Sequence, residues 1–142
     1  MALVVGACST ADPVSDYLDS IGEITLTMRN ETVAAIAGGE QISRAGIAEV
    51  VEARQRGLAA IQEVDPPPDF SPEHAVLLRV LAELATASEM FMASTTHLNP
   101  SQFEQAVLAA FELDKIVARV GTACIAVERR AENLVTAVDL SC

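Results

Sequence analysis

The chain has 142 residues, which suits one domain, and 51% of them are hydrophobic although only 4% are aromatic. The formal net charge of −11 argues against binding to nucleic acid or to anionic membrane surfaces, because both are themselves negative. No segment approaches the roughly 18 to 20 unbroken apolar residues that span a bilayer. Alanine-rich stretches with only seven glycines favour helix throughout. We therefore predict an all-α protein, an up-down-up-down four-helix bundle.

The first twelve residues precede the predicted helices and contain a short apolar stretch that ends in a cysteine. Val5-Gly6-Ala7-Cys8 resembles a bacterial lipobox, in which small residues precede a cysteine that is acylated, with palmitate for example, and becomes the mature N-terminus. The charged segment and the longer apolar run of a signal peptide are missing, as in a trimmed chain or one with a late start codon. We interpret residues 1–8 as a truncated lipoprotein signal with Cys8 as the lipidation site, and residues 9–12 as a short tether. The alternative is an ordinary apolar N-terminus that contains a cysteine.

Residues 13–142 form the predicted helical bundle, and its first half contains two helices. Asp12-Pro13 has the cap-then-proline pattern of a helix start, and Gly38-Gly39 ends this helix. Its apolar stripe consists of Leu18, Ile21, Ile24, Met28, Thr32 and Ala35. The second stripe consists of Ile47, Val50, Val51, Leu58, Ile61 and Val64. Gly57 within it marks a close helix approach, and the prolines at 66–68 stop the helix because they lack backbone donors.

Two more helices are predicted in the second half. Ser71-Pro72 starts the third, whose stripe consists of Leu77, Leu81, Leu84, Ser88, Phe91 and Thr95. Asn99-Pro100, with a capping-box glutamine at Gln102, starts a fourth helix of about 35 residues. We expect this long last helix to overhang its partners or to bend near Gly121. Its stripe consists of Phe103, Val107, Ala110, Phe111, Val117, Val120, Cys124, Val127, Ala131 and Leu134.

The chain has three cysteines, so in a secreted protein one of them would remain outside any disulfide pair. With Cys8 carrying lipid, Cys124 and Cys142 remain as a disulfide pair that closes a loop of about 18 residues and contributes roughly 3 kcal/mol. A continuous helix would hold their Cα atoms about 27 Å apart, whereas a disulfide needs less than about 7 Å. The last helix must therefore stop between Asn133 and Thr136 and the tail must fold back. Three apolar tail residues would then cap the core: Val135, Val138 and Leu140. Two buried thiols in a cytosolic protein are the alternative.

Metal and haem sites find little support in the sequence. A di-iron bundle needs Glu-x-x-His, which does not occur, and the adjacent Glu73 and His74 point in different directions from a helix start. Covalent haem needs Cys-x-x-Cys-His, which is also missing. A Met/His ligand pair would combine His97 with one of three methionines, Met28, Met90 or Met92, and packing explains these better. We expect no cofactor and no metal.

Catalytic groups are equally sparse, so we do not expect an enzyme. Nucleophilic catalysis needs a base and an orienting group beside Ser or Cys, and the chain has only two histidines. Arg129-Arg130 suits the negative end of a helix dipole. Three polar residues lie on or beside the buried stripes, where they line a small polar cavity or satisfy themselves on backbone carbonyls: Ser88, Thr95 and Asp114.

Three features of the sequence together resemble those of one group of proteins. They are the lipobox-like start, the Pro-Pro-Pro-Asp-Phe-Ser-Pro-Glu-His stretch at 66–74 and the Cys124/Cys142 ending. With them the chain resembles small helical lipoproteins of bacterial envelopes, for which we can assign no activity. The resemblance implies a non-enzymatic protein, anchored to a membrane through Cys8 on its extracytoplasmic side, that binds a partner protein or serves as an accessory module. The alternative is a small-molecule-binding or sensor bundle. The wide apolar stripes are also compatible with a homo-oligomer.

Overall fold

The computed structural model describes residues 12–37, 42–134 and 138–140, and these residues contain helices and no strands. The prediction of an all-α protein is confirmed. Five α-helices and one 3₁₀ turn follow one another: α1 (Pro13–Ala37), α2 (Arg44–Gln62), η1 (Pro68–Phe70), α3 (Ser71–Ser94), α4 (Pro100–Leu108) and α5 (Phe111–Leu134).

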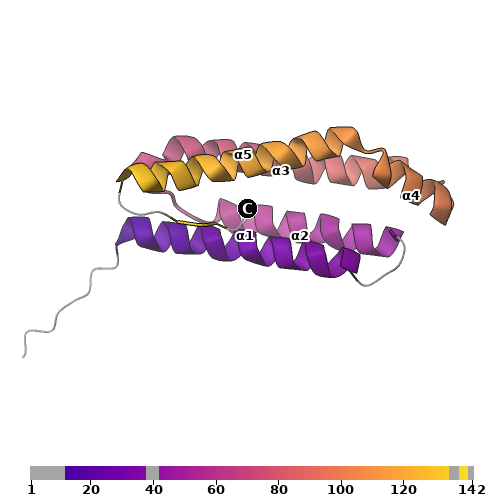
Figure 1. Cartoon of the computed structure of the whole chain (residues 1–142), viewed down its shortest axis with the longest axis horizontal. Coiled ribbons are helices and arrows are strands. Elements are labelled where there is room, and N and C mark those ends of the chain that lie inside the picture. The colour runs from indigo at the N-terminus through magenta and orange to yellow at the C-terminus, as the bar shows by residue number, and fades with distance from the viewer. Residues whose placement is uncertain (1–11, 38–41, 135–137, 141–142) are drawn as a thin grey trace, which may run out of the picture.

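The helices lie in two layers. α1 packs along α2, α2 along α3, and α3 along α5. In Figure 1, α1 and α2 form one layer, α3 and α5 form the other, and α4 extends beyond them. We call the end that contains Phe70 and the start of α1 the crossover end, and the opposite end the α4 end. No helix in the described ranges combines the length and hydrophobicity needed to cross a bilayer.

The predicted side-chain caps are present at the starts of α1 and α4, but the cap predicted at Ser71 is wrong. Ser71 is the first residue of α3, Phe70 occupies the N-cap position, and no side chain caps this helix. The Asp12 carboxylate accepts a hydrogen bond from the Val14 amide at 3.2 Å at the start of α1. The Asn99 side chain accepts from the Gln102 amide at 3.0 Å, and the Gln102 side chain accepts from the Asn99 amide at 3.1 Å. These reciprocal bonds form the predicted capping box of α4.

The expectation of one long last helix is wrong. The chain leaves helical geometry at Ala109 and Ala110, so α4 and α5 are separate helices, and Gly121 lies inside α5. Glu112 and Asp114 occupy the first turn of α5, where carboxylates favour a helix N-terminus. Three residues of α5 that were expected in the core are exposed: Phe111, Val117 and Leu134.

The C-terminal tail returns to the bundle. α5 ends at Leu134, inside the predicted interval, and Leu140 is fully buried in the same cluster as Cys124. The Leu140 amide donates to Glu128 of α5 at 2.8 Å, and its carbonyl accepts from the Thr25 hydroxyl of α1. Val138 packs against the cluster, as predicted. Cys8, Val135 and Cys142 lie outside the described residues, so the disulfide pairing and the lipidation site stay predictions.

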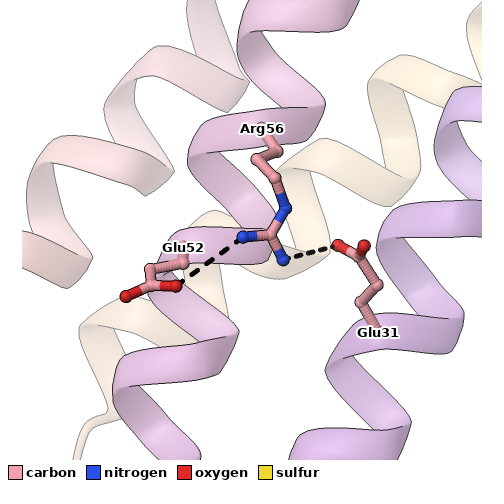
Figure 2. A network of polar contacts seen from close by, with 3 residues as sticks. All are labelled: Glu31, Glu52 and Arg56. Carbon is pink, nitrogen blue, oxygen red and sulfur yellow. Dashed lines mark hydrogen bonds and ion pairs between the residues drawn. The ribbon is translucent and has the colours of Figure 1, made fainter.

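α1 and α2 approach each other closely through glycines. A Cβ atom on Gly57 would lie 2.7 Å from the Met28 sulfur, which confirms the predicted close approach there. Nearer the start of α2, a Cβ on Gly46 would lie 2.7 Å from the Ala35 carbonyl oxygen, an atom of rigid helix backbone. On the surface, Arg56 of α2 bridges Glu31 of α1 at 3.0 Å and Glu52 at 3.7 Å (Figure 2). Such exposed ion pairs contribute little, so the glycines set the spacing.

We predict that Gly46→Ala destabilises the fold by about 1 to 3 kcal/mol, because the added methyl group must push two helix backbones apart. Gly121→Ala is the matched control, since nothing lies within 4 Å of a Cβ there and alanine favours helix. Urea unfolding followed by circular dichroism measures both. Equal stability of the two variants would contradict a backbone contact at Gly46.

Candidate functional site

An apolar groove opens where α4 and α5 separate. Its walls come from the second half of α3 and the start of α5, and its volume is about 460 Å³. The side chains that define it are Met90, Phe91, Phe111, Leu113 and Ile116. We call this feature the Met90–Phe111 groove.

The groove exposes large apolar side chains. Met90 is 67% exposed and Phe111 is 68% exposed, and Leu108 beside the break is 64% exposed. A contiguous exposed apolar surface of this kind is typical of a binding site rather than of an inert surface. Sequence reasoning placed Phe111 in the core because it assumed an unbroken helix. The acidic pair Glu112 and Asp114, which marks a new helix start, was the signal that could have revealed the break.

The helix connections beside the groove are firmly packed. Phe103 of α4 is 1% exposed, and its ring centroid lies 6.0 Å from that of Phe91, which lines the groove. The guanidinium carbon of Arg44 lies 4.2 Å from the Phe103 ring centroid, within cation–π range. Arg44 also donates to the carbonyl oxygen of Thr95. The contacts join α2, α3 and α4, so the groove is present before any partner binds.

The polar residues on the α3 stripe do not form a shared cavity. Ser88 donates to the Leu84 carbonyl at 2.7 Å and accepts from Arg54 at 2.8 Å. Thr95 donates to the Phe91 carbonyl at 2.9 Å. Asp114 is exposed in the first turn of α5. Ser88 and Thr95 therefore satisfy themselves on backbone carbonyls, the second of the two interpretations, and arginines from α2 complete their hydrogen bonding.

At the crossover end, a tyrosine and a histidine are buried together. The Tyr17 hydroxyl lies 3.3 Å from Nδ1 of His74, and the two residues are 3% and 5% exposed. The Tyr17 ring also packs on Phe70, with centroids 5.0 Å apart. Burial raises the pKa of Tyr17 far above its usual value, and the nearby Glu73 carboxylate adds to this. Burial lowers the pKa of His74, against a smaller opposing effect of Asp65.

The other candidate ligands have packing or surface positions. Met28 contacts Gly57 and Met90 lines the groove, while His97 is exposed in the turn after α3. Cys124 is fully buried in the core. Within the described parts of the chain, no group of three or more His, Cys, Asp or Glu residues is placed to hold a metal ion.

Comparison of the chain with protein-family models, with curated proteins and with solved structures finds no match. The candidate site therefore has to be interpreted from its own geometry.

The buried His74 predicts a pH-dependent stability. Its pKa is lower in the folded chain than the usual value of about 6.5. Between these two values the unfolded chain binds more protons, so stability falls as pH decreases below about 6.5. Tyr17 from α1, Asp65 from the crossover and the neighbouring Glu73 are the titratable groups around it. Urea unfolding between pH 7.5 and 5 should show a shallower decrease for His74→Gln.

His97→Gln is the matched control, because this second histidine is exposed and its loss should leave the pH profile unchanged. A steep decrease that persists in His74→Gln would assign the effect to carboxylates instead.

Proposed function

We propose that the protein is a non-enzymatic, lipid-anchored component of a bacterial cell envelope that binds a partner protein through the Met90–Phe111 groove. The observation that carries the proposal is the groove itself, in which two large apolar side chains are about two-thirds exposed beside a rigid helix connection. The anchor is Cys8, and the membrane side is extracytoplasmic.

The position of the groove favours a protein over the bilayer as its occupant. Four residues lie between Cys8 and Pro13, where α1 begins at the crossover end. α4 lies at the opposite end (Figure 1), and the groove is lined by residues that follow α4 directly. The 24 residues of α5 span about 36 Å between these ends. A bundle anchored through Cys8 and standing on the membrane holds the groove away from the lipid surface.

Shape and charge define the partner. An apolar groove between helices can take the apolar face of an amphipathic helix, with side chains spaced by three and four residues. The chain carries 20 acidic and 9 basic residues, and Glu112 lines the groove itself. We therefore propose an amphipathic partner helix whose polar face is basic, because opposite charge speeds encounter and disfavours wrong partners.

The proposal includes an up-down-up-down order of the four long helices and a Cys124–Cys142 disulfide that holds the tail. Support comes from the buried Leu140, which lies two residues before Cys142 and shares a cluster with the fully buried Cys124. Such a link would make the tail return permanent, and disulfides persist outside the cytoplasm.

A small-molecule-binding or sensor bundle is the second candidate. Its support is the groove volume of about 460 Å³, within the roughly 300 to 1,000 Å³ of ligand pockets. We prefer the protein partner because Met90 and Phe111 project largely into solvent, whereas ligand pockets enclose most of their ligand. A ligand that raises the melting temperature of the wild-type chain and not that of Phe111→Ser would favour this second candidate.

We predict that a photocrosslinking amino acid at Phe111, in cells that make the lipidated protein, captures a basic amphipathic helix of one partner. The crosslinked peptide is identified by mass spectrometry. Val33 is the matched control site, because it is 53% exposed on α1 and does not line the groove. Met90→Ser should reduce crosslinking at 111 by at least tenfold with little loss of stability, since Met90 is mostly exposed.

The identity of the crosslinked molecule decides the outcome. A basic amphipathic segment supports the proposal. A peptide of this same chain would replace it with a homodimer, and a lipid adduct would show that the groove faces the bilayer.

The intact mass of the full-length protein from native membranes tests the anchor. We predict a diacylglyceryl addition on Cys8 and a gain of about 2 Da on reduction, which corresponds to opening one disulfide. Cys142→Ser should abolish the 2 Da gain and leave the lipid in place. An unmodified N-terminus with three thiols would contradict the envelope location.

A further inference from the structure

A second hollow lies near the crossover end, between the start of α3 and the last turns of α5. Its volume is about 440 Å³. Glu73 lines it from α3, and Arg129, Arg130 and Asn133 line it from α5. We call it the Glu73–Arg129 cleft. Unlike the Met90–Phe111 groove, it therefore presents groups of opposite charge from two different helices.

The carboxylate of the cleft is incompletely satisfied. Glu73 Oε2 is buried and has no hydrogen-bond partner among the described residues. Carboxylate oxygens that are shielded from water normally accept hydrogen bonds, since an unmatched one is costly. The same carboxylate also lies close enough to the buried Tyr17 to raise the pKa of its phenol. A positive charge that binds in the cleft beside Glu73 would compensate the charge of this carboxylate.

The two arginines of the cleft have different surroundings. The Arg130 Nε donates to the Asp69 carbonyl at 2.8 Å, and its Nη2 lies 3.8 Å from an Asp69 carboxylate oxygen. This fixes the guanidinium of Arg130 against η1. Arg129 is exposed, and within the described residues no ion pair or hydrogen bond holds its side chain. The cleft thus holds one positioned guanidinium and one that can reorient onto a ligand.

We propose that this cleft binds a zwitterion that joins a phosphate to a primary ammonium, the chemistry of a phosphoethanolamine group. The phosphate contacts Arg129 and Arg130, because guanidinium groups match phosphate oxygens and donate several hydrogen bonds. The ammonium donates to the Glu73 carboxylate where this side chain lines the cleft, and the two opposite charges attract. Neither charge alone fits the cleft as well, since a bare anion would face Glu73 and a bare cation would face the arginines.

The choice of phosphate over carboxylate rests on the proposed anchor. The cleft lies near the crossover end, where α1 begins shortly after Cys8, so anchoring brings it towards lipid headgroups. Free phosphoethanolamine compounds share the same chemistry, and the experiment separates the two sources.

Isothermal titration of the full, non-lipidated chain with O-phosphoethanolamine tests the cleft without the anchor. We expect saturable one-to-one binding, and at least tenfold weaker binding of inorganic phosphate and of ethanolamine. Glu73→Gln and Arg129→Gln should each weaken binding at least tenfold. Arg29→Gln, an exposed arginine on α1 outside the cleft, is the matched control and should bind as the wild type does. Circular dichroism checks that each variant folds.

Vesicles identify the source of the ligand. Sedimentation with vesicles that contain phosphatidylethanolamine in phosphatidylcholine, against phosphatidylcholine alone, should show Glu73-dependent binding if the headgroup is the ligand. Binding of the free compound without vesicle binding supports the cleft with a soluble ligand. No binding of O-phosphoethanolamine, or equal binding of inorganic phosphate that ignores Glu73→Gln, would overturn the proposal. Neither result depends on the Met90–Phe111 groove or on lipidation of Cys8.

Discussion

The break between α4 and α5 is the constraint on which the α4 end of the structure depends. A helix continued without interruption from Pro100 would hold Phe103 and Phe111 on one stripe. With the break at Ala109 and Ala110, Phe103 is buried against Phe91 and under Arg44, whereas Phe111 faces outward. One change of direction therefore completes the packing of α2, α3 and α4 and leaves apolar surface exposed beside it. The capping box at Asn99 holds the start of α4 in place.

The two ends of the bundle use different chemistry. The crossover end is closed by aromatic packing of Tyr17 on Phe70, by the buried His74 and by the returning Leu140. The Glu73–Arg129 cleft on its surface is lined by charged side chains of both signs. The α4 end has a cleft that is mainly apolar. The two ends therefore differ in the ligands that they suit. We propose a phosphoethanolamine group at the crossover end, near the anchor, and a partner helix at the α4 end, away from it.

Small residues shape the interior as much as large ones. With only 4% aromatic residues, the chain packs its helices closely. Gly46 lets α2 approach the backbone of α1 at Ala35, and Gly57 makes room for the Met28 side chain of α1. Half-buried arginines of α2 provide hydrogen bonds to polar groups of the neighbouring helix. Arg54 donates to the Ser88 hydroxyl of α3, and Arg44 donates to the hydroxyl and the carbonyl oxygen of Thr95, the C-cap residue of α3. Burial lowers the pKa of Arg54, the expected effect of taking a cation out of water.

The sequence by itself determined the helical class, the helix starts at Pro13, Ser71 and Pro100, and the interval in which the last helix ends. These are local properties, because proline, capping residues and apolar spacing act over one or two turns. It also predicted that the tail returns, from a distance argument about two cysteines. The break in the last helix had one sequence signal, the acidic residues Glu112 and Asp114 that suit a helix start, but the Ala-Ala step before them is equally compatible with a continuous helix. Only the tertiary structure decided between the two. The exposure of Phe111 and the placement of Glu73 and Arg129 around one cleft depend on how segments distant in the sequence pack together, which local patterns do not encode.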